Sequence, residues 1–217
     1  MYAEDSIDIF VYENFFKDQK CTMVEIGAGH PTYISMSKYF RELGWRCIGI
    51  DANAKFVKMH IDLGYEVYNV ACADYEGVSS FKIYNTGHWD EENEGISFSA
   101  LDLRYKPAVN YDFEEVEIRV TTLNSLLDSI GVKTLEYISV DVEGWEIEVL
   151  KGLDVEKFNT KVIAIEDCNN SELYKSYMRS INFGLAYKSR HNYVYKNNRF
   201  WPNPMFDEKP NLRQYTQ

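Results

Sequence analysis

The sequence is poor in features that would mark a membrane, a zinc site or a nucleic-acid surface. It has no run of about 18 apolar residues, so no membrane-spanning helix is expected. Its 4 cysteines are widely spaced and form no C-x-x-C pair, so we interpret them as reduced core thiols. The first ten residues, "MYAEDSIDIF", are acidic, unlike a secretory signal. These absences predict a cytoplasmic protein.

Positive charge is also scarce. Lys and Arg number 23 against 34 Asp and Glu, which gives a net charge of −11. Binding to a phosphate backbone needs clustered Lys and Arg, and no basic stripe is visible, so nucleic acid is not expected as a partner. A hydrophobic share of 45% and a charged share of 26% are typical of a globular chain, and 217 residues suit one domain.

Segments with strand character alternate with segments of helical spacing. The expected strands are 21–27, 46–51, 65–72, 79–85, 116–120, 135–141 and 161–167, followed by a hairpin of 184–190 and 192–197. The expected helices are 5–18, 33–43, 53–64, 122–131, 145–152 and 171–182, with Asp5 or Ser6, Asn53 and Thr122 as caps. This alternation predicts an α/β, Rossmann-like fold: a mostly parallel sheet with helices on both faces and an antiparallel strand near the C-terminal edge.

Acidic residues stand at the ends of the predicted strands. Ligands of such sheets bind at the carboxyl ends of the strands, so these acids are expected to gather at one site. They are Glu25, Asp51, Asp74, Asp141, Glu166 and Asp167.

The glycine turn in "TMVEIGAGHPTYISM" lacks a third glycine. Gly27 and Gly29 fit a dinucleotide fingerprint, but Thr32 stands where that fingerprint has its last glycine. Glu25 would repel a pyrophosphate, whereas S-adenosylmethionine carries an ammonium, a sulfonium and no phosphate. Asp51 is expected to accept hydrogen bonds from the ribose hydroxyls and Asp74 from the adenine amine. The expected cofactor-binding set is Glu25, Gly27, Ala28, Gly29, Asp51, Ala52, Asp74 and Asp141.

Four segments together resemble the FkbM family of S-adenosylmethionine-dependent methyltransferases: "VEIGAG", "VACADYEG", "VTTLNSLLDSIG" and "YISVDVEGWEIEVLKG". The resemblance covers roughly residues 20 to 196. It implies a class I methyltransferase fold with seven strands and O-methylation of a sugar, a glycan or another small hydroxylated metabolite. It places Asp141 and Glu143 in the family's D-V-E-G motif.

Removal of the acceptor proton needs a base or a metal. Asp141 ends one strand, and Glu166 and Asp167 end the next, so these three are the candidate ligands for Mg²⁺ or Mn²⁺. Alternatively, Glu166 and Asp167 only bind the adjacent loop or the acceptor. The candidate catalytic residues are Asp141, Asp167 and His191, with His30 and His88 as further candidate bases.

We expect one domain over residues 1–217. Residues 20–85 form the cofactor half, 86–115 an insertion or lid, 116–200 the catalytic half, and 201–217 a tail. Other functions remain open: an N-methyltransferase or another small-molecule methyltransferase, a nucleotide-cofactor oxidoreductase, or a cofactor-binding scaffold without catalysis. The chain is either a free enzyme or one domain of a larger glycan-modifying protein.

Overall fold

The computed structural model describes residues 2–84, 99–100, 112–166, 172–190 and 192–203. Its helical elements are η1 (Glu4–Ser6), α1 (Ile7–Val11), η2 (Tyr12–Phe16), α2 (Lys38–Glu42), α3 (Ala54–Asp62), α4 (Leu123–Ser129), α5 (Glu146–Lys151) and α6 (Glu172–Ser180). Its strands are β1 (Thr22–Ile26), β2 (Arg46–Asp51), β3 (Glu66–Asn69), β4 (Ala71–Cys72), β5 (Gly77–Tyr84), β6 (Ser99–Ala100), β7 (Phe113–Thr121), β8 (Tyr137–Val140), β9 (Val162–Glu166), β10 (Phe183–Lys188) and β11 (Asn192–Asn197).

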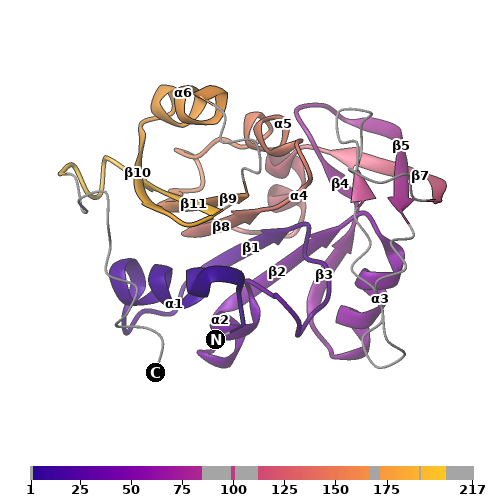
Figure 1. The fold of residues 1–217 in the computed structure, drawn as a ribbon, viewed down its shortest axis with the longest axis horizontal. Coiled ribbons are helices and arrows are strands. Elements are labelled where there is room, and N and C mark those ends of the chain that lie inside the picture. The colour runs from indigo at the N-terminus through magenta and orange to yellow at the C-terminus, as the bar shows by residue number, and fades with distance from the viewer. Residues whose placement is uncertain (1, 85–98, 101–111, 167–171, 191, 204–217) are drawn as a thin grey trace.

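A seven-stranded sheet forms the centre of the molecule (Figure 1). Its strand order is β10-β11-β9-β8-β1-β2-β3. The strands from β9 through β3 pair in parallel, and β11 runs antiparallel to both β9 and β10. The predicted Rossmann-like sheet and its antiparallel strand near the C-terminal edge are therefore confirmed.

Alternation along the central strands divides the core between the two faces of this sheet. Val24 and Ile26 of β1 belong to one apolar cluster, which also contains buried side chains from α4, α5 and α6. Met23 belongs to a second cluster, built with α1, η2 and α2. Since successive strand residues point to opposite faces, nearly continuous apolar strands require helices on both sides.

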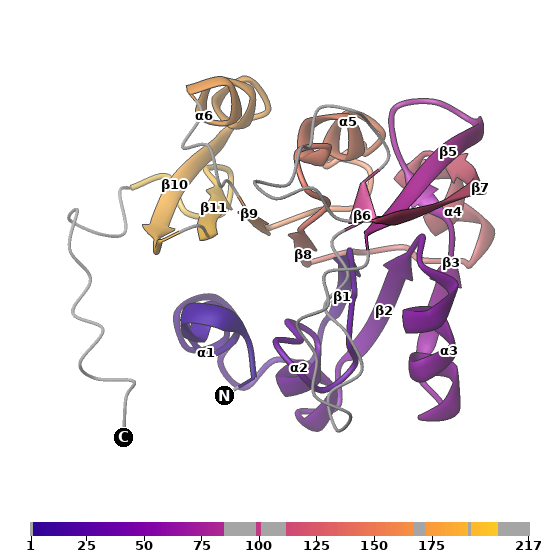
Figure 2. The same ribbon diagram turned by 45° about the vertical axis from the view of Figure 1, so that its right-hand side comes forward.

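A second, four-stranded sheet has the order β4-β7-β5-β6 and lies beside the first (Figure 2). This second sheet is not predicted by the alternation of strands and helices in the sequence. The strand expected over 65–72 divides at Val70: β3 completes the large sheet, whereas β4 pairs with β7. The strand expected at 116–120 also begins earlier, at Phe113, inside the segment assigned to the insertion. Within that segment, residues 86–98 and 101–111 lie outside the described residues.

Two predicted helices are shorter than expected. The 33–43 helix is helical only over α2, because backbone groups before it bind a buried carboxylate. The 5–18 helix begins at Ile7, after Asp5 and Ser6 adopt left-handed φ angles of 52° and 59° and provide no cap. The caps predicted at Asn53 and Thr122 are confirmed, since their side chains accept hydrogen bonds from Lys55 N and Ser125 N.

Among the helices of the described residues, none combines the length and the apolar character that crossing a bilayer requires.

Candidate functional site

A cavity of about 340 Å³ lies at the carboxyl ends of the central strands. A cavity of this size at this edge of an α/β sheet is the usual location of a small-molecule site. The described residues that line it are Glu4, 26–30, 33–34, 50–52, Phe56, 70–72, Phe81, 141–143 and Glu166. They come from the ends of β1, β2, β8 and β9, from β4 and β5 of the second sheet, and from the N-terminal segment.

The glycine turn forms one wall of the cavity. Gly27 has a φ of +76°, and its amide and that of Ala28 donate to Ile50 O at 2.9 and 3.2 Å. A Cβ added to Gly27 would lie 1.8 Å from the backbone oxygen of Asp141. Only glycine therefore fits here, because the turn after β1 passes directly against the end of β8.

Asp51 is a buried cavity residue whose carboxylate is held by two backbone amides. It accepts hydrogen bonds from Gly29 N at 2.8 Å and Asn53 N at 2.7 Å. Burial raises its pKa to about 6, although the two hydrogen bonds favour the ionised form and so lower the pKa. Asp51, which the sequence predicts at the cofactor ribose, thus lines the cavity.

Glu25 lies behind the cavity, outside the residues that line it. Its two oxygens accept hydrogen bonds from Met36 N at 2.6 Å and Ser37 N at 3.1 Å. Burial raises its pKa despite these bonds. Glu25 thus fixes the segment that connects the glycine turn to α2, and the structure gives it no contact with the cavity.

Asp74 is exposed and is likewise absent from the cavity lining. Apolar side chains from the same part of the chain occupy the wall instead, namely Val70, Cys72 and Phe81. This part of the cavity offers an apolar surface, which suits a flat heteroaromatic ring. Ala28 and Ala52, also expected at the cofactor, line the cavity.

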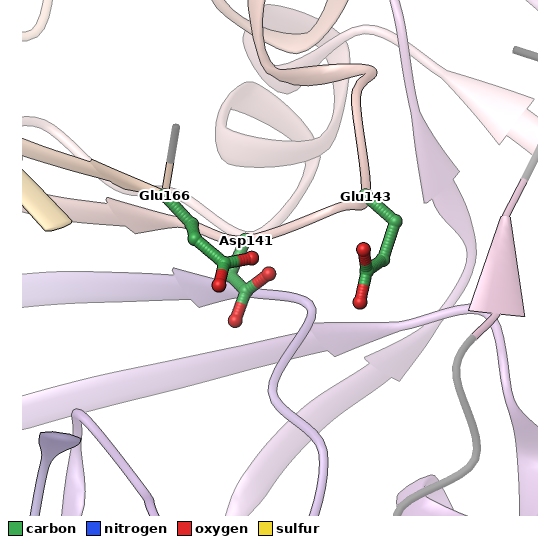
Figure 3. Close-up of side chains that lie close together, drawn as sticks. All are labelled: Asp141, Glu143 and Glu166. Carbon is green, nitrogen blue, oxygen red and sulfur yellow. The ribbon is translucent and has the colours of Figure 1, made fainter. Parts of the chain in front are cut away.

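Three carboxyl groups meet at the ends of β8 and β9. Asp141, Glu143 and Glu166 each offer an oxygen within 4.8 Å of the others' oxygens. Figure 3 shows the Asp141 and Glu166 carboxyl groups side by side, with Glu143 set along the loop toward α5. Asp141 and Glu166 are expected here from the sequence, whereas Glu143 is predicted only as part of the D-V-E-G motif.

Crowding of these acids perturbs their protonation. The Asp141 side chain remains accessible from the cavity, but protein surrounds it on its other sides. This burial and the adjacent Glu166 carboxyl raise the pKa of Asp141 well above its usual value. Burial and the charges of Glu166 and Glu146 raise the pKa of Glu143 to about 8. Asp141 and Glu143 therefore keep their protons to a higher pH than ordinary carboxyl groups do.

Glu146 holds the loop that presents this cluster. Its Oε1 accepts hydrogen bonds from Val142 N at 3.1 Å and Gly144 N at 3.0 Å, and its other oxygen accepts one from the Tyr174 hydroxyl. Glu143 consequently adopts a left-handed φ of 56°, which costs free energy for a residue other than glycine. These hydrogen bonds fix the loop, and they could not be predicted from the motif "DVEGWE" alone.

Two of the four histidines support loops, and the other two lie outside the described residues. His30 Nδ1 accepts from Thr32 N at 3.2 Å and Tyr33 N at 3.1 Å, so this nitrogen carries no proton. His60 Nε2 contacts Gly29 O at 3.1 Å, and burial lowers its pKa to about 4, so a neutral His60 donates to the glycine turn. His191 lies outside the described residues, as do Asp167 and His88.

Comparison with known proteins gives one family match. A model described as "Methyltransferase FkbM domain" matches residues 25–195. Among curated proteins, none matches the chain. One similar solved structure is M. capricolum TrmK in complex with S-adenosyl-homocysteine. It shares 10% identity, has a TM-score of 0.47, and the similarity covers 89% of this chain and 68% of that one.

Proposed function

The chain belongs to the FkbM family of S-adenosylmethionine-dependent methyltransferases, and on that premise we propose that it transfers a methyl group to a hydroxyl of a sugar, glycan or similar small metabolite. The observation that carries this proposal is the arrangement of one cavity. A glycine turn and a carboxylate at the end of β2 lie on one side, and an acid cluster lies at the ends of β8 and β9.

The cofactor would lie along the first of these sides. Asp51 has the position and the charge to accept hydrogen bonds from two ribose hydroxyls, and Gly27 and Gly29 let a ligand approach the backbone closely. The apolar wall at Val70 and Cys72 would contact the adenine ring. Asp74 is proposed to act at the adenine side, and Glu25 to act indirectly, through the loop that it fixes.

The acid cluster would accept the proton that the acceptor hydroxyl loses. When bound, S-adenosylmethionine would supply the methyl group to the acceptor oxygen from its sulfonium and would be left as a neutral thioether. The hydroxyl proton must leave at the same stage, and Asp141 in its ionised form can take it. Glu166 and Glu143 would share that proton within the cluster. Asp167 and His191 remain proposed catalytic residues.

The same three carboxyl groups offer the hard oxygen ligands that Mg²⁺ and Mn²⁺ prefer, so a metal-assisted reaction is the second candidate. Glu143 would then replace or join Asp167 in the ligand set that the sequence predicts. Binding of a cation would replace the protons held by the cluster. A direct carboxylate base needs no such ion, but it acts only in its ionised form.

Chelation separates these two mechanisms. With a carboxylate base, we expect turnover to persist after dialysis against EDTA, within about twofold of its initial value. Loss of turnover in EDTA, with recovery on addition of Mg²⁺ or Mn²⁺, would establish the metal-assisted reaction instead. The control is the affinity for S-adenosylhomocysteine, which EDTA should leave unchanged in both cases.

Cofactor binding should depend on pH through Asp51. Its pKa is about 6 in the free protein, and ribose hydroxyls that donate to the carboxylate would lower that value. Binding therefore favours the ionised form, and affinity should rise about tenfold between pH 5 and pH 7 and then level off. Calorimetric titration with S-adenosylhomocysteine across this range measures the effect. Asp51→Asn should bind more weakly and lose this dependence; a mutant that keeps the slope would refute the assignment.

A further inference from the structure

A residue that precedes the family match forms part of the cavity wall. The match begins at residue 25, yet Glu4 lines the cavity, together with Tyr33 and Ile34. The inference that follows rests on the proposed function and concerns the acceptor end of the same site.

Several contacts fix the segment that carries Glu4. Asp8 Oδ2 accepts hydrogen bonds from Tyr2 N at 3.0 Å and Ala3 N at 3.2 Å. The Tyr2 hydroxyl donates to Glu42 Oε1 at 2.8 Å, and Lys38 Nζ lies 4.0 Å from the centre of the Tyr2 ring. The chain therefore reaches Glu4 in a defined position, even though Glu4 itself is exposed.

One hydrogen bond connects Glu4 to the strand next to the acid cluster. Asn192 Nδ2 donates to Glu4 Oε2 at 3.3 Å, and Asn192 is the register partner of Glu166 in the β11–β9 ladder. Glu4 thus belongs to the β9 end of the cavity. Asp51 ends β2, which is three strand positions from β9, or about 14 Å along the sheet edge.

Tyr33 and Ile34 add an apolar surface that is open to incoming molecules. Tyr33 is 51% exposed and Ile34 46% exposed, and both line the cavity. Ile34 adopts a φ of +51°, a strained conformation for a β-branched residue, which keeps this pair displayed at the cavity rather than folded into α2. An aromatic ring and a carboxylate on the wall of one cavity suit a ring-shaped molecule that has apolar faces and hydroxyl edges.

We propose that Glu4 is a specificity-determining residue of the acceptor site, which with the Tyr33 ring selects an uncharged, hydroxylated ring over one that carries a carboxylate or phosphate. The Glu4 carboxylate accepts hydrogen bonds from hydroxyl groups and repels an anion. Glu4 adds its charge at the end of the cavity that already holds Asp141, Glu143 and Glu166. Such selectivity arises as much from the repulsion of an anionic acceptor as from the hydrogen bonds to a neutral one.

The test compares matched acceptors on the full chain. The pairs are methyl glucoside with methyl glucuronide, methyl galactoside with methyl galacturonide, and methyl mannoside with its 6-phosphate. Wild type should methylate neutral members in preference to anionic ones. Glu4→Gln keeps an accepting oxygen and removes the charge, so the anionic-to-neutral ratio of kcat/KM should rise about tenfold. Asp5→Asn is the matched control, because it removes the adjacent charge from an exposed residue outside the cavity lining.

Affinity for S-adenosylhomocysteine and the thermal unfolding midpoint should remain at wild-type values in Glu4→Gln, which separates selectivity from a structural effect. Equal wild-type rates on both members of a pair would overturn the inference. So would a Glu4→Gln ratio equal to that of Asp5→Asn. Absence of turnover on every pair by a wild type that binds S-adenosylhomocysteine also overturns it, because the acceptor is then of another class. Absence of cofactor binding instead overturns the proposed function.

Discussion

Replacing Asp141 with Asn should lower kcat by about 100-fold or more, since positioned general bases contribute factors of 10² to 10⁴. The amide keeps the size of the carboxyl group but cannot take the acceptor proton. The effect on S-adenosylhomocysteine affinity should be much smaller than the effect on kcat. Steady-state kinetics with the best acceptor, together with calorimetry, measure both quantities. Asp62→Asn serves as the control, because Asp62 lies on α3 in an exposed pair with Lys58.

The pH profile provides a sharper version of this test. A base must be ionised to act, so kcat should rise with pH as the cluster loses its protons. The Glu143 carboxylate is one of the charges that raise the pKa of Asp141. Glu143→Gln should therefore move the midpoint of the kcat profile to lower pH, whereas Asp62→Asn should leave it in place. An unchanged midpoint in Glu143→Gln, or full activity in Asp141→Asn, would remove the cluster from the reaction.

Replacing Gly27 with Ala should have the largest effect on folding. The added Cβ would lie 1.8 Å from Asp141 O and 2.9 Å from Asp141 C, in a residue with a φ of +76°. The left-handed backbone alone costs about 1–2 kcal/mol for a residue with a Cβ. The clash with another strand end adds the cost of moving that backbone, so the total should reach about 3 kcal/mol or more.

Gly131→Ala is the matched control for that prediction. Gly131 has a φ of +71°, but nothing lies within 4 Å of its added Cβ. It should therefore show the backbone cost alone, about 1–2 kcal/mol. Urea denaturation of both variants gives the two free energies of unfolding. Equal losses in the two variants would show that the contact between the glycine turn and the end of β8 does not constrain the chain.

The sequence predicts the parts of this site that depend on local pattern. Alternating strands and helices give the sheet, and the carboxyl-end rule brings Asp51, Asp141 and Glu166 to one cavity. Asn53 and Thr122 are recognisable as caps because capping is a property of a few consecutive residues.

Local sequence patterns cannot predict features that depend on contacts between residues far apart in the chain. The 65–72 strand divides because Ala71 and Cys72 pair with β7, which the local alternation of residues cannot reveal. Glu25 fits an ammonium ligand by charge, yet its oxygens are used by backbone amides before α2. Glu4 lies at the cavity because the N-terminal segment extends to β11, where Asn192 donates a hydrogen bond to Glu4. A family motif also cannot indicate Glu4, because the matched region begins after it.

The most direct test of the central claim is calorimetric titration of the full chain with S-adenosylhomocysteine, with NAD titrated in parallel. We expect one S-adenosylhomocysteine site per chain with a micromolar dissociation constant, weakened at pH 5, and no heat from NAD. Saturable binding of NAD, with no heat from S-adenosylhomocysteine at pH 7, would contradict the account and assign the glycine turn to another cofactor.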